Sequence, residues 1–141
     1  MEIGIERART IIAAALAAGQ AAGMKPLSVV VLDAGGHPVA FERADGASPG
    51  RFEIARGKAY GAVMLGMGGR AQAERAAQGP AFMAAVNGAF GGRVIPVPGG
   101  VLVRDANGRV LGAVGVTGDT SDNDAEAALA GIAAAGLHGE A

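Results

Sequence analysis

The sequence predicts an α+β domain in which helices pack against an antiparallel sheet. Apolar residues recur at helical spacing near both ends of the chain. Two pairs of short β-branched runs are each joined by a glycine-containing turn, which is typical of β-hairpins. The resulting order is helix, hairpin, helices, hairpin and helix, with no linker or internal repeat. We therefore expect residues 1–141 to form a single domain.

The first predicted helix spans residues 3–22, where apolar residues from Ile5 to Leu16 share one face and Gly23 follows the last turn. Most residues on that face are small, so we expect the helix to pack closely on a sheet. The charged residues Glu6, Arg7 and Arg9 interrupt the apolar run. This pattern favours an amphipathic helix over a secretion or membrane segment, and hence a cytoplasmic protein without membrane partners.

The first hairpin is predicted from strands at residues 27–33 and 38–43, with a glycine pair between them. The dipeptide Ser48-Pro49 is typical of a helix N-cap followed by proline at the first helical position. A second helix is therefore predicted from Pro49 to about Leu65.

Two short helices, at residues 71–78 and 80–87, are predicted for the middle of the chain. Strands at residues 100–104 and 109–116 flank an Asn-Gly pair, which is a strong hairpin signal. The last helix is predicted to begin near Asn123, which has the spacing of a capping box with Glu126, and to end at Gly136.

Composition excludes several classes of site. The chain has no cysteine, so disulfides, thiolate nucleophiles and cysteine-ligated metals are excluded. The net charge is −1, only 4% of residues are aromatic and tryptophan is absent, so neither charge nor base stacking supports nucleic-acid binding. The motifs of nucleotide-binding loops, zinc proteases and serine hydrolases are also absent.

The stretch Asp33-Ala34-Gly35-Gly36-His37 contains one of the two histidines in the chain. His37 at a hairpin tip is a candidate metal ligand or acid–base group, with Asp33 beside it. The alternative is turn chemistry alone, in which the aspartate caps the turn and the glycines adopt positive φ angles. Arg43, after the following strand, is a candidate anion donor or else part of an exposed charged loop.

Two further stretches are candidates for ligand binding, one with two cationic side chains and one with a pair of glycines. Arg51 and Lys58 are seven residues apart and share a helix face, which could bind carboxylates such as haem propionates or a small organic acid, or could be solvated. Gly99-Gly100 leads into a strand, so its backbone N–H groups could line an anion pocket or simply form a type II turn.

The last motif runs from Gly115 to Asp124, where a strand ends in a loop rich in hydroxyl and carboxylate groups. Thr117 and Asp119 are candidate ligand-binding and acid–base residues at the start of a helix; helix capping is the alternative. The acidic run does not fit a calcium loop, because Ala130 stands where the bidentate glutamate belongs.

Taken together, these motifs resemble the GlcG/HbpS family, also known as the DUF336 or haem-degrading-domain family, which includes the C-terminal domain of PduO-type proteins. The matching segments are "VVVLDAGGHPVAFERADGA", "EIARGKAYGAV", "VPGGVLVRDANGRVLGAVGVTG" and "DNDAEAALAGIAA". Their order and spacing are similar to those of the family from about Ile3 to Ala135.

The resemblance implies a profilin-like central antiparallel sheet of about five strands flanked by helices. It also implies homo-oligomers, as tetramers or octamers, and a role in haem binding, redox sensing or the metabolism of small acids. Axial haem ligands are usually His, Cys, Met or Tyr. His37 lies in a matched motif, whereas His138 lies in a glycine-flanked tail that we expect to be mobile. Tyr60 and the five methionines are further candidates, and His37 is the preferred ligand.

Three functional hypotheses follow. The first is a haem- or tetrapyrrole-binding protein with a redox-sensing or haem-degrading role. The second is a cofactor-free isomerase, lyase or hydrolase acting on a small organic acid or carbonyl compound. The third is an assembly or accessory subunit without chemistry. For the second, Arg43 or Lys58 would bind a carboxylate, and the acid–base candidates are His37, Asp33, Tyr60 and Asp119.

Overall fold

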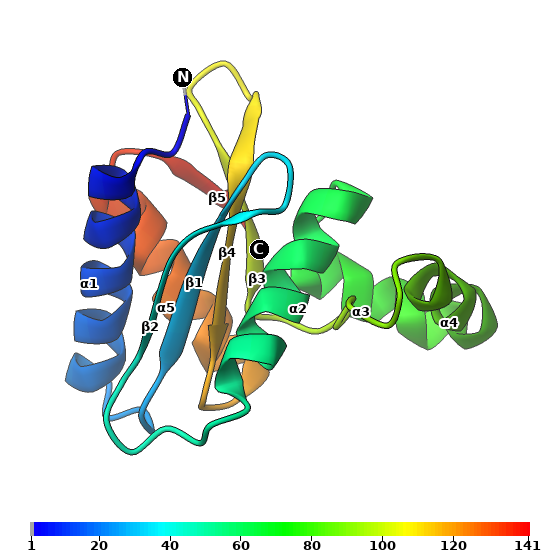
Figure 1. Cartoon of the computed structure of the whole chain (residues 1–141), viewed down its shortest axis with the longest axis horizontal. Helices are drawn as coiled ribbons and strands as arrows, with labels where there is room; N and C mark the ends of the chain where they lie inside the picture. Colours follow the sequence, from blue (N-terminus) through cyan, green and yellow to red (C-terminus); the bar gives the residue numbers. More distant parts are fainter. Residues whose placement is uncertain (1) are drawn as a thin grey trace.

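Two antiparallel hairpins form most of the sheet in the computed structural model, which describes residues 2–141 (Figure 1). The described residues form five α-helices and a five-stranded sheet. The helices are α1 (Ile5–Ala21), α2 (Arg51–Leu65), α3 (Gly69–Gln78), α4 (Pro80–Ala89) and α5 (Ser121–Ala134). The strands are β1 (Ser28–Asp33), β2 (Pro38–Arg43), β3 (Gly100–Arg104), β4 (Val110–Thr117) and β5 (His138–Glu140).

The strand order is β2-β1-β4-β3-β5, and every neighbouring pair is antiparallel. β1 and β4 pair along their lengths, with Ser28 opposite Thr117 and Asp33 opposite Gly112. This register defines two ends of the sheet. One end carries the turn between β1 and β2, and the other carries the loop that follows β4. The predicted α+β class and antiparallel sheet are confirmed.

Helices cover both faces of the sheet. α1 and α5 pack together on one face, and α2 crosses the other (Figure 1). Side chains of β1 alternate between the two cores: Val29 and Val31 join the core beneath α1 and α5, and Val30 and Leu32 join the core beneath α2. All four are fully buried, which explains why β1 appears in the sequence as a continuous apolar run.

Glycines on the sheet allow α2 to approach the strands closely. A Cβ atom added at Gly115 of β4 would overlap the backbone oxygen of Ala55, and one added at Gly100 of β3 would overlap that of Lys58. Gly100 and Gly115 therefore serve helix–sheet packing.

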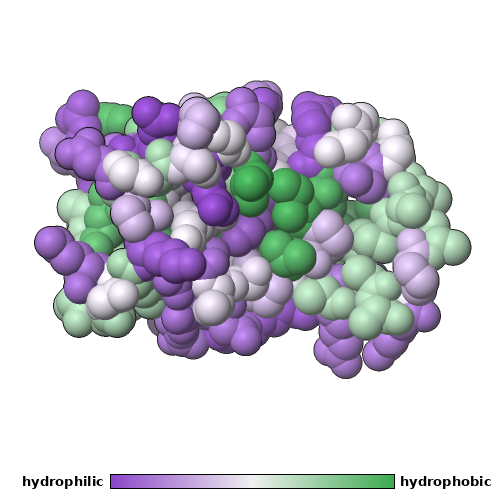
Figure 2. Space-filling model, turned by 90° about the horizontal axis from the view of Figure 1, so that it is seen from below, coloured by the Kyte–Doolittle hydropathy of each residue, from purple (hydrophilic) through white to green (hydrophobic). Residues whose placement is uncertain are grey.

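α3 and α4 form an arm that extends from the far end of α2 (Figure 1). No charged residue occurs between Arg75 and Arg93, and Phe82 on α4 is 65% exposed. Figure 2 shows apolar surface at the end of the molecule where this arm lies, and a second apolar area between the arm and the sheet. No helix within residues 2–141 is long and apolar enough to cross a membrane.

Three local predictions are wrong. Ser48 is not the N-cap of α2, because Pro49 and Gly50 form a turn and the helix begins at Arg51. Asn123 does not cap α5: the helix begins at Ser121, and the Thr120 side chain accepts a hydrogen bond from the backbone N–H of Asn123.

The third correction concerns the C-terminal segment, which we expected to be a mobile tail. Residues His138–Glu140 instead form β5, and His138 lies opposite Arg104 of β3. β5 is short and fully exposed, so its pairing depends on the neighbouring strand and not on an apolar pattern of its own.

Candidate functional site

The loop after β4 and the start of α2 form a cationic cavity at one end of the sheet. Arg51 donates from Nη1 to Thr117 Oγ1 and from Nε to Ser48 Oγ, at 3.0 Å in each case. These contacts hold the guanidinium against the end of β4. The cavity measures about 220 Å³ and is lined by Lys25, Pro26, Gly46, Ala47, Ser48, Arg51 and Gly118. Its cationic and hydroxyl groups suit a small anion.

Beside this cavity, Lys58 forms a buried ion pair with Asp124. Lys58 Nζ lies 3.1 Å from Asp124 Oδ2 and donates a second hydrogen bond to the Val116 carbonyl oxygen at 3.1 Å. Burial lowers the pKa of Lys58, and Arg51 lowers it further, while Asp124 opposes this change. Asp124 Oδ1 also accepts the backbone N–H of Asp119. The pair therefore ties α2 to β4 and α5.

Gly99 and Gly100 lie against Lys58 and not beside the open cavity. Gly99 has a φ angle of +115°, and a Cβ atom there would lie 2.9 Å from Lys58 Nζ and 2.6 Å from the Val116 carbonyl oxygen. The two glycines therefore create the space for the buried ammonium group. A ligand-binding role for them stays a prediction.

Asp119 connects two loops at the same end of the sheet. Its Oδ1 accepts the backbone N–H of Lys25 at 3.0 Å, and its Oδ2 accepts Asn123 Nδ2 at 2.7 Å. The Lys25 N–H is the main reason that the pKa of Asp119 is lowered to about 2. Asp119 is therefore ionised at neutral pH, which suits an anchoring role better than proton transfer.

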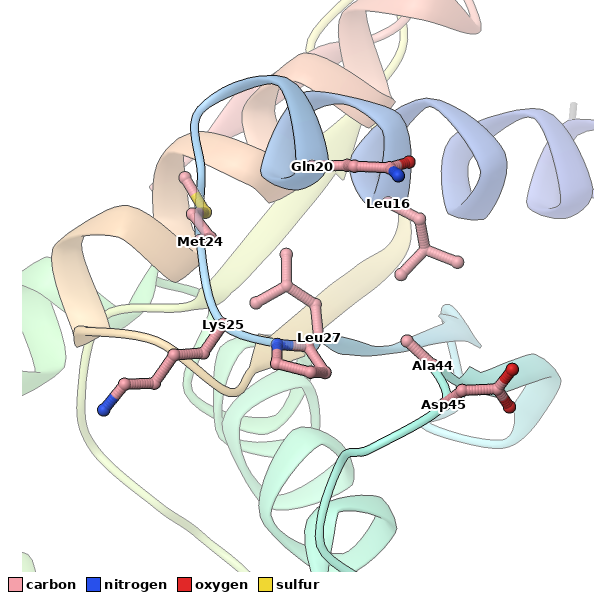
Figure 3. A pocket seen from close by; sticks show the side chains of 8 residues that line it. Leu16, Gln20, Met24, Lys25, Leu27, Ala44 and Asp45 are labelled. Atoms are coloured by element: carbon pink, nitrogen blue, oxygen red, sulfur yellow. The ribbon is translucent and has the colours of Figure 1, made fainter.

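A neighbouring cleft of about 380 Å³ lies between the end of α1 and the segment after β2. Leu16 and Leu27 point toward each other across it, while the Lys25 and Asp45 side chains extend away in different directions (Figure 3). Lys25 also lines the cationic cavity, so the two hollows adjoin. None of the candidate residues from the sequence lines this apolar cleft.

The opposite end of the sheet carries the hairpin tip with His37. Asp33 Oδ1 accepts the backbone N–H groups of Gly35 and His37 at 2.9 Å each, and it lies 3.4 Å from His37 Nδ1. The hydrogen bond from the His37 backbone is the main reason that the pKa of Asp33 is lowered. The His37 side chain is 80% exposed. The carboxylate thus faces Nδ1, and Nε2 stays accessible.

A cleft of about 310 Å³ lies beside Asp33. It runs between the β1–β2 turn and the start of β4 and is lined by Glu2, Ile3, Asp33, Ala34, Gly35, Val39, Arg109, Val110 and Leu111. Arg109 supplies a cation at this end of the sheet.

Tyr60 lies beneath the hairpin tip and is only 7% exposed. A Cβ atom at Gly36 would lie 3.4 Å from the Tyr60 ring and 2.8 Å from Met64 Cε, so the turn rests directly on α2. The Phe90 ring packs edge-on against Tyr60 at 6.0 Å, and the Arg93 guanidinium lies 4.6 Å from the Tyr60 ring centroid.

The second hypothesis groups His37 with Asp119 as acid–base candidates, but the structure places these two residues at opposite ends of the sheet. Asp33 and Thr117 lie at opposite ends of the β1–β4 ladder. Five residues of strand separate them, or roughly 17 Å. Arg43 lies opposite Ser28, at the Thr117 end of the sheet, but it is exposed and lines neither hollow there. The candidate residues therefore fall into two groups, one at the Asp33 end of the sheet and one at the Thr117 end.

Sequence reasoning missed the partner of Lys58 and two arginines. Asp124 was placed in a capping loop, because no local pattern reveals a partner 66 residues away. Arg56 and Arg93 both line a third cleft; Arg56 lies within the matching segment "EIARGKAYGAV", but neither arginine was chosen as a site residue. Within residues 2–141, no three His, Cys, Asp or Glu side chains are grouped closely enough to hold a metal ion.

Comparison with known proteins gives consistent matches. A family model described as "Haem degrading protein HbpS-like" matches residues 3–133. The crystal structure of HbpS has a TM-score of 0.80 at 30% identity, with 94% of this chain and 89% of that chain covered. No curated protein gives a significant sequence match.

Two other solved structures share the fold. The Klebsiella pneumoniae protein ORFY, of family DUF336, has a TM-score of 0.84 at 25% identity over 96% of this chain and 92% of its own. The PduOC–haem complex has a TM-score of 0.86 at 23% identity, over 97% of both chains. At that identity the second match supports the fold alone.

Proposed function

Because the chain belongs to the HbpS-like family of haem-degrading proteins, we propose that it binds haem and that His37 is the axial ligand of the iron. The observation that carries this assignment is the geometry of Asp33 and His37. Asp33 Oδ1 lies 3.4 Å from Nδ1, and the imidazole is exposed. A carboxylate at one ring nitrogen orients a histidine so that the other nitrogen can bind a metal.

The remaining donors fit an axial role less well. The chain has no cysteine, Tyr60 is buried beneath the hairpin, and His138 lies in β5 without a carboxylate held against it. The cleft beside Asp33 supplies apolar walls and the guanidinium of Arg109. Since His37 is so exposed, haem would be held at the surface or between two copies of the chain. Bound haem would supply one-electron and oxygen chemistry.

The test is a titration with haemin. We expect a Soret band from the unmodified protein, and its loss or shift in His37→Ala. The matched control is His138→Ala, which should leave the spectrum unchanged. An unchanged spectrum in His37→Ala would remove His37 as the ligand, and no binding at micromolar haemin would overturn the haem proposal.

Redox sensing and haem degradation are finer roles that depend on this binding. Their test is to supply the haem-loaded protein with a chemical reductant, with and without oxygen. Loss of the Soret band only when both are present would support degradation. A reversible shift on reduction without loss of the band would support redox sensing.

The cationic cavity favours a second function, the binding of a small organic acid. Arg51, Lys25 and Ser48 line one hollow, and Arg51 is fixed by Thr117. The acid–base candidates His37, Asp33 and Tyr60 lie at the other end of the sheet, and Asp119 is ionised. This arrangement supports binding over catalysis. Stabilisation by small carboxylates in a thermal-shift screen, abolished in Arg51→Gln, would establish this site.

A further inference from the structure

Arg56 is an unusual feature of α2. Its Nε atom is buried and has no hydrogen-bond partner. Within residues 2–141, no carboxylate lies within ion-pair distance of its guanidinium. Buried polar groups are nearly always satisfied, and a guanidinium has five donors. Arg56 Nε is therefore a buried donor for which residues 2–141 provide no acceptor.

A second arginine faces the same cleft. Arg93 donates from Nε to the Phe90 carbonyl oxygen at 2.9 Å and lies 4.6 Å from the Tyr60 ring centroid. These contacts fix its position, and none of its other nitrogens donates to an acceptor within residues 2–141. The turn that carries Arg93 is ordered by Asn87, whose side-chain oxygen accepts the Val94 N–H at 2.9 Å. The two arginines therefore come from separate elements, Arg56 from α2 and Arg93 from the loop after α4.

The cleft between them measures about 260 Å³ and is lined by Glu53, Arg56, Gly57, Gly92, Arg93 and Ile95. Glu53 is exposed and forms no ion pair with either arginine, so the lining carries a net positive charge. Gly57 lets Ile95 pack closely on α2, because a Cβ atom there would lie 2.7 Å from Ile95 Cδ1. Ile95 adds an apolar wall beside the cations.

From this geometry we propose that the Arg56–Arg93 cleft binds a carboxylate group carried on an apolar or aromatic body. Planar guanidinium groups match the two oxygens of a carboxylate, and a carboxylate in the cleft would supply the acceptor that Arg56 lacks within residues 2–141. The apolar part of the ligand would contact Ile95. The site lies on α2 and the loop after α4, and it shares no lining residue with the Arg51 cavity.

The carboxylate could come from a small free acid or from the propionates of a tetrapyrrole. Benzoate and succinate probe the first source. Metal-free protoporphyrin IX, compared with its dimethyl ester, probes the second. None of these probes contains iron, so the outcome does not depend on an axial ligand. The proposed role of His37 and this site can therefore fail independently.

Binding is measured by isothermal titration calorimetry on the full chain. We expect Arg56→Gln to weaken binding of the recognised carboxylate about tenfold or more. Arg9→Gln on α1, across the sheet, is the matched control and should bind as the unmodified protein does. Tighter binding of protoporphyrin IX than of its ester would assign the site to propionates. Binding of benzoate or succinate that is weakened in Arg56→Gln would assign it to a free acid.

Three results would overturn the proposal. The first is that the unmodified protein binds none of these carboxylates. The second is that Arg56→Gln binds these carboxylates as tightly as the unmodified protein does, and that only its affinity for inorganic phosphate is lower. The third is that acid and ester forms of the porphyrin bind equally and neither small acid binds. If Arg56→Gln fails to fold, Arg93→Gln in the loop after α4 tests the same cleft and should weaken carboxylate binding in the same way.

Discussion

At the scale of single residues, the buried Lys58–Asp124 pair connects α2 to β4 and α5 near the cationic cavity. Both side chains are almost completely buried, at 4% and 1% exposure. Removal of one partner leaves an uncompensated buried charge. We therefore expect Asp124→Ala to lower the free energy of unfolding by about 3–5 kcal/mol in urea denaturation.

The control for this prediction is Asp122→Ala, because Asp122 lies two residues earlier and its side chain is 80% exposed. Its effect should be below about 1 kcal/mol. The double variant Lys58→Met, Asp124→Leu should recover most of the stability, since an apolar pair of similar volume can replace a buried ion pair. Equal effects of Asp122→Ala and Asp124→Ala would contradict this account.

Asp119 gives a prediction for acid pH. Its pKa of about 2 in the folded chain lies below the ordinary value of 3.8. The stability that it contributes is therefore fully present above about pH 4 and is lost as the pH falls toward 2. Asp119→Asn should be less stable than the unmodified chain at pH 7, and the difference should shrink toward pH 2.

Unfolding curves at pH 7, 4 and 2.5 would measure this trend. Asp45→Asn is the matched control, because Asp45 is exposed and accepts no hydrogen bond from the residues around it. A difference between Asp119→Asn and the unmodified chain that stays constant with pH would exclude the proposed linkage.

The sequence predicted the candidate residues that depend on local chemistry. Asp33 and His37 lie in one turn, so their contact follows from a motif of five residues. Arg51 and Thr117 were both identified, but their hydrogen bond joins residues 66 apart and could not be predicted. Arg56 lies in a segment that matches the family, but the sequence does not single it out, because its missing acceptor is visible only in the folded chain.

At the scale of secondary-structure elements, close packing of α2 on the sheet depends on Gly100 and Gly115. A methyl group at Gly100 would overlap backbone atoms of Lys58, which cannot move aside as a side chain can. We expect Gly100→Ala to lower the free energy of unfolding by about 1–3 kcal/mol or more. The measurement is equilibrium denaturation in urea.

Gly88→Ala is the matched control, because Gly88 lies in α4 and has no atom within 4 Å of the added Cβ position. Alanine favours a helix over glycine by roughly 0.5–1 kcal/mol. This variant should therefore be neutral or more stable. The two substitutions are chemically identical, so effects of the same sign and size would show that close packing of α2 does not limit stability.

Helices and strands with a clear sequence pattern of their own were predicted well. Elements whose bounds depend on contacts in the folded chain were not. β3 lies at the predicted residues 100–104, and α4 begins at the predicted Pro80. The start of α5 was misplaced because Thr120 and Asn123 are both good capping residues, and only the folded loop selects one. β5 was missed because three exposed residues have no strand pattern.

At the scale of the whole molecule, the uncharged helix α4 of the arm gives a prediction for assembly. We expect the chain to form homo-oligomers, with α4 in contact with a second copy. The arm has no charged residue between Arg75 and Arg93, so two copies can meet there without opposing like charges. Phe82, at 65% exposure, would lie in that contact.

Light scattering coupled to size-exclusion chromatography would test this interface. The unmodified chain should have a mass that is a multiple of 13.7 kDa. The oligomer of the Phe82→Glu variant should have a dissociation constant at least tenfold higher. Thr10→Glu, on the exposed side of α1, is the control and should assemble normally. A monomeric unmodified chain, or an equal mass for both variants, would exclude α4 as the contact.

The strand order has a consequence for hydrogen exchange. β1, β4 and β3 each have a strand on both sides, whereas β2 and β5 are edges. Backbone amides of the three inner strands should therefore exchange slowest, so a ligand can add little protection there. New protection would be confined to the amides near the ligand: Gly35 to His37 for the hairpin tip, Ala47 to Arg51 for the cationic cavity, and Gly92 to Ile95 for the arginine cleft. The exchange pattern would thus identify the occupied site before the ligand is known.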